Sequence, residues 1–270
     1  MISFPPCKIN LGLNVISKRP DGYHEIETCF YPVPWTDILE IIPSDVLTFT
    51  NSGNSIPGEK EDNLCLLAYQ LLKSDFDLEP VKIHLHKIIP TGAGLGGGSS
   101  NAALTLRLLN TIFNLGLNVD QLKKYASQLG SDCAFFIEDK PMIGSGRGEV
   151  LKEAKLKWAG KFVVIVKPEV HVSTAGAYTG VKPALKLVGV KYIVERTTFG
   201  KWKNLLVNDF EESVFEKHPL IKEIKEKLYQ QGAVYASMSG SGSAIYGIFE
   251  KPVKLKDHFP AMTYWSGVLN

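Results

Sequence analysis

The first regular pattern in the chain is an alternation of apolar residues with polar or small ones across segment 7–16. The apolar positions are Ile9, Leu11, Leu13 and Val15. A period of two is typical of a half-buried β-strand. The other face of that strand then carries Lys8, Asn10, Gly12 and Asn14.

Helical and strand periodicities recur along the rest of the chain and predict a mixed fold. Helices are expected at 64–72, 101–113, 120–129 and 220–228, and further strands at 81–89, 162–166, 233–238 and 244–249. Asp62 or Asn63 should cap the first helix, and Gly130 stands where the third should end. The class is therefore α+β. The glycine-rich segment 144–149 is expected to be a turn or hinge between two units, 1–150 and 151–270.

A glycine-rich segment at 90–101 joins the expected strand 81–89 to the helix after it. Glycines allow positive φ and let an anion approach the main-chain amides closely. A helix start adds N–H groups without partners and a positive dipole end, which together make an anion site. Ser99 and Ser100 are expected to cap the helix, and a hydroxyl there can also reach a metal on a phosphate. A flexible surface turn is the less favoured interpretation.

The residues around the glycines exclude several known types of phosphate-binding loop. No lysine follows the glycines, which excludes a Walker loop. The spacing Gly92-x-Gly94-x-x-Gly97 fits a dinucleotide fingerprint, but the nearest acidic candidate, Asp120, begins a helix instead of ending a strand. The protein-kinase signatures His-Arg-Asp and Asp-Phe-Gly are absent. The loop is therefore an anion cradle of another type.

Charge and cysteine content favour a small-molecule partner in a reducing compartment. Thirty basic residues against 28 acidic ones leave a net charge of +2 without a clustered basic excess, so nucleic acid is not expected as a partner. No signal peptide and no apolar run of ~18 residues is found, so neither export nor membrane insertion is expected. Four cysteines without CxxC pairs or zinc-finger spacing predict reduced thiols and a cytoplasmic location.

Three motifs stand in order along almost the whole chain. They are Pro-Cys-Lys-Ile-Asn at 6–10, Pro-x-x-x-Gly-Leu-Gly-Gly-Gly-Ser-Ser-Asn-Ala-Ala at 90–103, and Met-Ser-Gly-Ser-Gly-Ser at 238–243. This set resembles the GHMP small-molecule kinases, which include galactokinase, homoserine kinase and mevalonate kinase. Arg-Pro-Asp-Gly-Tyr-His at 19–24 and Ser-Asp at 131–132 are similar to the branch that acts on a CDP-linked methylerythritol. Two glycines at 97–98, where much of the superfamily has serine, also favour this branch.

The resemblance implies a two-domain GHMP kinase fold. Its N-terminal domain, 1–150, would be ribosomal-protein-S5-like with a left-handed βαβ crossover, and its C-terminal domain, 151–270, would be ferredoxin-like. The implied activity is ATP- and Mg²⁺-dependent phosphorylation of the 2-hydroxyl of CDP-methylerythritol in the non-mevalonate isoprenoid pathway. No metal ligand is assigned among the side chains, and the chain is expected to be a monomer or a weak homodimer.

The same resemblance assigns Asp132 and Lys8 to catalysis. Phosphoryl transfer passes through a loose transition state, so the protein chiefly positions reactants and neutralises charge. Asp132 would accept the hydroxyl proton, while Lys8 would polarise that hydroxyl and keep the carboxylate ionised. Without the resemblance, Asp132 could equally cap the next element, and Lys8 would be read as a surface lysine.

The resemblance also implies binding residues for both substrates. Tyr23 would stack on cytosine, His24 would bond to its edge, Tyr178 is a weaker candidate for the opposite stacking face, and Asn10 could bind the diol or a phosphate. The residues expected to contact ATP are Asn63, Lys87, Pro90, Thr91, Gly92, Ala93, Gly94, Leu95, Gly96, Gly97, Gly98, Ser99, Ser100 and Asn101. His84 and His86 are interpreted as a solvated strand face, not as a metal pair.

Two alternatives remain open. The same scaffold could phosphorylate another small acceptor, such as homoserine, mevalonate or a sugar. It could also be a non-catalytic nucleotide sensor, which the presence of both Lys8 and Asp132 disfavours.

Overall fold

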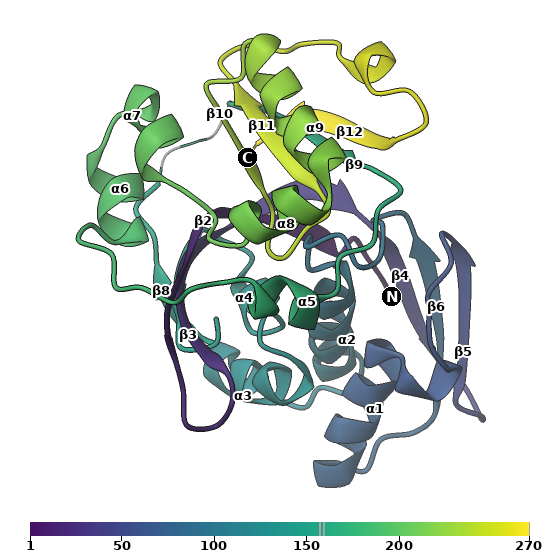
Figure 1. Ribbon diagram of the computed structural model, residues 1–270. Coiled ribbons are helices and arrows are strands. Elements are labelled where there is room, and N and C mark those ends of the chain that lie inside the picture. The colour runs from purple at the N-terminus through teal and green to yellow at the C-terminus, as the bar shows by residue number, and fades with distance from the viewer. Residues whose placement is uncertain (157, 159, 270) are drawn as a thin grey trace. The chain divides into compact units, whose positions relative to one another are not determined.

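Two units, each assembled from segments far apart in the sequence, make up the chain. The computed structural model describes residues 1–156, 158 and 160–269 (Figure 1). Unit 1 comprises Met1–Cys7, Trp35–Thr91 and Gly96–Lys140, and unit 2 comprises Lys8–Pro34, Gly92–Leu95 and Pro141–Asn270. The expected boundary between sequence domains at residue 150 stays a prediction.

Unit 1 contains a mixed sheet in the order β1-β4-β6-β5. Its strands are β1 (Ile2–Ser3), β4 (Ile38–Pro43), β5 (Thr48–Gly53) and β6 (Val81–Lys87). β4 is antiparallel to β6, whereas β5 is parallel to β6, and helix α1 (Leu64–Asp75) lies in the connection between the two parallel strands. The expected strand at 81–89 is thereby confirmed as β6, and the handedness of the crossover stays a prediction.

The other helices of unit 1 are η1 (Lys60–Asp62), α2 (Gly97–Ile112), α3 (Val119–Leu129) and α4 (Phe135–Glu138). Asn63 caps α1, as expected, by accepting a hydrogen bond from the main-chain N–H of Cys65 at 2.9 Å. Gly130 is the C-terminal cap of α3, also as expected. The expectation that Ser99 or Ser100 caps α2 was wrong: the left-handed conformation of Gly96 begins the helix, and both serines lie inside it.

Two further sheets are built mainly or entirely from unit 2. One has the order β2-β3-β7-β8, and the other is an antiparallel sheet of order β10-β11-β9-β12. The strands are β2 (Pro6–Lys18), β3 (His24–Thr36), β7 (Met142–Ser145), β8 (Val150–Glu153), β9 (Phe162–Lys167), β10 (Tyr235–Met238), β11 (Ile245–Phe249) and β12 (Thr263–Val268). Residues 146–149 form a turn that joins β7 to β8, and a hinge between two units at 144–149 stays a prediction.

Strand β2 differs from its expected half-buried form, because its first ten residues are all buried. Lys8, Asn10 and Asn14 on its polar face are between 1% and 4% exposed. The alternation of apolar and polar residues predicted the strand correctly. It could not show that the polar face would also be buried, because that depends on residues elsewhere in the chain.

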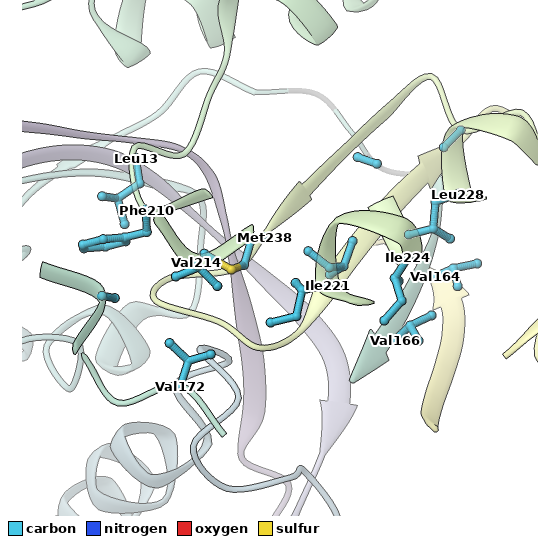
Figure 2. Close-up of a cluster of buried hydrophobic side chains, with 14 of the residues drawn as sticks. Leu13, Val164, Val166, Val172, Phe210, Val214, Ile221, Ile224, Leu228 and Met238 are labelled. Carbon is cyan, nitrogen blue, oxygen red and sulfur yellow. The ribbon is translucent and has the colours of Figure 1, made fainter. Parts of the chain in front are cut away.

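The core of unit 2 forms where helix α9 (Pro219–Gln230) covers the antiparallel sheet. Figure 2 shows Ile224 and Leu228 of α9 beside Val164 and Val166 of β9. Burying one such aliphatic side chain stabilises the fold by about 1.5–3 kcal/mol. The remaining helices of this unit are α5 (Thr174–Thr179), α6 (Val190–Arg196), α7 (Phe199–Leu205), α8 (Glu211–Lys217) and η2 (Lys256–His258).

Two findings concern the chain as a whole. Cys7, Cys29, Cys65 and Cys133 are buried thiols, in agreement with the expectation that they are not disulfide-bonded. Among the described residues, no helix combines the length and the apolar character needed to cross a membrane.

Candidate active site

The glycine loop alternates between left-handed and ordinary backbone conformations. Gly92, Gly94 and Gly96 have φ angles of +61°, +75° and +68°. This left-handed region is accessible to glycine at little cost and to other residues only with strain. Every second residue of the loop therefore has to be glycine for this path to form, whereas Gly97 and Gly98 already belong to helix α2.

Within unit 2, the loop packs against the turn that joins β10 to β11. The carbonyl of Gly94 accepts hydrogen bonds from the Ser239 hydroxyl at 2.8 Å and from the Lys8 ammonium at 2.9 Å. The main-chain N–H of Ala244 donates to the carbonyl of Ala93 at 3.2 Å. These bonds hold the turn that contains Ser239 against the glycine loop.

A side chain at position 94 has no room. A Cβ atom built on Gly94 would lie 1.9 Å from the Ser239 carbonyl oxygen, and φ is already positive there. Gly94→Ala is therefore expected to lower the free energy of unfolding by about 2–4 kcal/mol, measured by urea denaturation. Nucleotide affinity should fall with it, because the loop must move away from the turn.

Gly58→Ala is the matched control for that variant. Gly58 also has a positive φ, +94°, but a Cβ there would meet nothing within 4 Å. The Gly58→Ala variant should lower the free energy of unfolding by only about 1–2 kcal/mol, the cost of placing alanine at a positive φ. Equal stability of the two variants would contradict the close packing of Gly94.

Within unit 1, the start of α2 presents main-chain donors. The first N–H groups of an α-helix have no acceptor inside the helix, and the helix dipole makes that end attractive to anions. The first internal bond runs from the N–H of Ser100 to the carbonyl of Gly96 at 2.9 Å. The Ser100 hydroxyl is fully buried and has no hydrogen-bond partner within the described part of the chain.

A buried polar cluster holds the two segments that flank the loop in unit 1. The Asp37 carboxylate, which is 0% exposed, accepts hydrogen bonds from the main-chain N–H groups of Ile88 and Ile89 at 2.7 and 2.8 Å. It also accepts bonds from the Asn101 amide at 2.9 Å and from the Lys87 ammonium. Asp37 thus connects the end of β6, just before the loop, to the first turns of α2, just after it.

Sequence reasoning had assigned Lys87 and Asn101 to nucleotide contacts and had missed Asp37. The Lys87 ammonium is 2% exposed and bonds to Asp37 and, at 3.0 Å, to the Asn101 amide oxygen. Both side chains therefore organise this cluster, and the expected nucleotide contacts stay predictions. The available signal was the position of Lys87 on the apolar face of the alternating strand, because a buried lysine requires an acidic partner.

Asp132 lies in the turn between α3 and α4, and its side chain is half-buried. The next residue, Cys133, is hydrogen-bonded through its thiol to Ser99 in the first turn of α2. Burial raises the pKa of the Cys133 thiol to about 12, and the bond to Ser99 partly offsets that rise. The segment that carries Asp132 therefore lies against the first turn of α2.

Lys8 and Asn10 form a second buried arrangement, in unit 2. The Lys8 ammonium donates to the Asn10 amide oxygen at 2.5 Å and lies 5.4 Å from the centre of the Phe30 ring. The Asn10 amide nitrogen donates to the Thr28 hydroxyl at 3.0 Å. Asn10 thus orients the Lys8 ammonium, and its expected contact with substrate stays a prediction.

The aromatic residues proposed for cytosine also lie in unit 2. The His24 ring stacks on Tyr178, with ring centres 4.6 Å apart and planes inclined by 15°. Tyr178 in turn packs edge-on against Phe210. Tyr23 is 54% exposed, and the Arg147 guanidinium lies over its ring. Tyr178 therefore stacks on His24 here, and its role opposite Tyr23 stays a prediction.

The two histidines of β6 bond to the neighbouring parallel strand. The His84 ring bonds to the hydroxyls of Thr50 and Ser52 at 2.8 and 3.0 Å, and the His86 ring bonds to Ser52 at 2.9 Å. These contacts agree with the interpretation of this face as a polar strand surface.

Comparison with known proteins yields two family matches. Residues 63–140 match the GHMP kinases N terminal domain, and residues 191–261 match the GHMP kinases C terminal domain. A 4-diphosphocytidyl-2-C-methyl-D-erythritol kinase from Cytophaga hutchinsonii is 54% identical over 250 residues, which cover 92% of each chain. The enzyme of that name from Parabacteroides distasonis is 47% identical and covers 100% of both chains.

Comparison with solved structures indicates the same family. A crystal structure of 4-(cytidine 5′-diphospho)-2C-methyl-D-erythritol kinase matches with a TM-score of 0.83 and 31% identity, over 100% of this chain and 99% of the other. A mevalonate kinase, at a TM-score of 0.72 and 15% identity over 100% and 99% of the two chains, shares the fold.

The fold and the glycine loop define a small-molecule kinase of the GHMP class. The chain belongs, within that class, to the 4-diphosphocytidyl-2-C-methyl-D-erythritol kinase family. The α+β class, the two-domain GHMP kinase fold and the family resemblance expected from the sequence are confirmed.

Proposed function

We propose that this chain transfers the γ-phosphoryl group of ATP to the 2-hydroxyl of 4-diphosphocytidyl-2-C-methyl-D-erythritol. The reaction belongs to the non-mevalonate route to isoprenoid precursors, as the names of relatives at 44–54% identity support. ADP is the second product.

One observation carries the assignment of the site. Helix α2 packs against both α3 and α4, and the turn between those two helices holds Asp132. The Cys133 thiol, next to Asp132 in the sequence, interacts with Ser99 in the first turn of α2. In this proposal the start of α2 binds the phosphates, and the Asp132 carboxylate acts beside it. Phosphoryl transfer to an alcohol requires both: donors for the phosphate oxygens and an acceptor for the hydroxyl proton.

The proposed chemistry follows from these groups. The main-chain N–H groups of the glycine loop and of the first turn of α2 hold phosphate oxygens. The acceptor hydroxyl attacks the γ-phosphorus, the bond from phosphorus to the bridging oxygen breaks, and the hydroxyl proton passes to the Asp132 carboxylate. Lys8, whose ammonium donates to the Asn10 amide oxygen and to the carbonyl of Gly94, is assigned the supply of positive charge during catalysis.

Magnesium fits this site through Ser100. Its buried hydroxyl, which has no partner among the described residues, lies in the helix turn that faces the phosphates in this proposal. Oxygen ligands are those that Mg²⁺ prefers, and the ion would offset the negative charge of the triphosphate.

The cytidine end of the substrate is assigned to Tyr23 and His24. A pyrimidine can stack on an aromatic ring, and an imidazole can both donate to and accept from its polar edge. Asn63 and the loop residues 90–101 are assigned to the nucleotide. A cytoplasmic location and a monomer or weak homodimer are retained as predictions.

A substrate panel tests the proposal. Purified protein with Mg²⁺ and ATP should release ADP with 4-diphosphocytidyl-2-C-methyl-D-erythritol, and only at background rate with homoserine, mevalonate or galactose. Turnover of one of the latter acceptors, without turnover of the cytidine compound, would replace the proposed substrate. ATP binding without any turnover would identify a nucleotide sensor.

A further inference from the structure

Two turns of unit 2 are bonded to each other beside Tyr23. One is the turn between β2 and β3, and the other is the turn between β7 and β8. Glu25 joins them: its carboxylate accepts the main-chain N–H of Gly146 at 2.8 Å and pairs with Arg19 at 3.1 Å. The N–H of Ile26 donates to the carbonyl of Gly146 at 2.8 Å. The second turn is therefore fixed in position against the first.

Arg147 projects from the second turn over the ring of Tyr23. Its guanidinium carbon lies 4.8 Å from the ring centre, which is cation–π distance. Glu149 holds the arginine in place, since it accepts the Arg147 main-chain N–H at 2.6 Å and lies 3.5 Å from the guanidinium.

The backbone of Tyr23 is restrained as well. Its main-chain N–H donates to the Asp21 carboxylate at 3.1 Å, and Arg19 pairs with that carboxylate. The bond from Arg19 lowers the pKa of Asp21. The side chain of Tyr23 is nonetheless 54% exposed, and Arg147 is the cation that covers one face of its ring.

From this geometry we infer that Arg147 is a positioning residue for the cytosine-binding ring of Tyr23. The inference rests on the proposed function. An aromatic ring has two faces, and the guanidinium occupies one of them, which leaves the other for the base. An exposed tyrosine would otherwise lose side-chain freedom when the base stacks on it, and that loss weakens binding. Arg147 restricts the ring before the substrate arrives.

Steady-state kinetics of Arg147→Ala test the inference. We expect KM for the cytidine substrate to rise roughly fivefold, the size expected for one partly desolvated cation–π contact. kcat and KM for ATP should change by less than twofold, because Arg147 acts on binding of one substrate. Arg147→Lys keeps a cation and should recover part of the loss. Lys152→Ala, which removes an exposed cation from β8, is the matched control.

A double-mutant cycle with Tyr23→Ala shows whether Arg147 acts through the Tyr23 ring or independently of it. If Arg147 acts through the Tyr23 ring, its removal should have no further effect on KM in the Tyr23→Ala background. Additive effects would show that Arg147 acts independently of the Tyr23 ring and would overturn the inference. An unchanged KM in Arg147→Ala would overturn it as well.

A measurement on the free protein tests the contact between Arg147 and Tyr23 without depending on the proposed function. In protein with ¹³C-labelled tyrosine rings, the Tyr23 signals, identified by their loss in Tyr23→Phe, should shift in Arg147→Ala. Unchanged signals would contradict the ring contact, whatever the substrate. Failure of the wild-type protein to bind CDP or to turn over the cytidine substrate would contradict the proposed function instead.

Discussion

Replacing Asp132 with alanine is expected to lower kcat by about 10²–10⁴-fold, the usual contribution of a positioned general base. The loss should appear in kcat, because the proton moves only as the phosphoryl group is transferred. KM for ATP should change little, since the proposed phosphate donors are main-chain N–H groups of the glycine loop and α2.

Asp120→Ala is the matched control for this variant. Asp120 is an exposed aspartate in the first turn of α3, away from the turn that holds Asp132. Initial rates of ADP release with saturating ATP and acceptor give kcat for both variants. A kcat for Asp132→Ala within a few-fold of the Asp120→Ala value would contradict the assignment of the base.

Replacing Asp37 with asparagine is expected to lower the free energy of unfolding by about 3–5 kcal/mol. The variant keeps the size of the side chain but leaves the Lys87 ammonium, 2% exposed, without its carboxylate. An uncompensated buried charge is far more costly than the loss of an exposed pair. Urea denaturation monitored by circular dichroism measures the difference.

Two further variants show whether the unpaired charge of Lys87 causes the expected loss of stability. Glu40→Gln removes an exposed carboxylate from β4 and should change the free energy of unfolding by less than about 0.5 kcal/mol. Asp37→Asn combined with Lys87→Met removes both buried charges and should recover much of the loss. A single variant as stable as wild type, or a double variant less stable than the single one, would contradict the buried ion pair.

Only part of the secondary structure was predictable, where periodicity and turn chemistry determine an element locally. Strands β2, β6 and β9 and helices α1, α3 and α9 follow from alternation, helical spacing and capping residues. The start of α2 was placed too late, at Asn101 instead of Gly97, because two consecutive glycines do not favour a helix. The left-handed Gly96 and the burial of the helix outweigh that preference.

The candidate site likewise contains some residues that the sequence predicts and others that it does not. The glycine loop, Lys8 and Asp132 could be found because they stand in short motifs that can be read along the sequence. Asp37 and Arg147 could not, because their roles come from residues distant in sequence: Asp37 bonds to Lys87, and Arg147 covers Tyr23. Whether a charged side chain faces water or a partner is decided by tertiary contacts, which a single sequence does not contain.

The most direct test is a crystal structure of the protein with Mg²⁺, a non-hydrolysable ATP analogue and 4-diphosphocytidyl-2-C-methyl-D-erythritol. We predict phosphate oxygens within about 3.2 Å of main-chain N–H groups in residues 94–100, and a carboxylate oxygen of Asp132 at hydrogen-bond distance from the 2-hydroxyl. Phosphates bound away from the start of α2, or an Asp132 side chain directed away from that hydroxyl, would contradict the account.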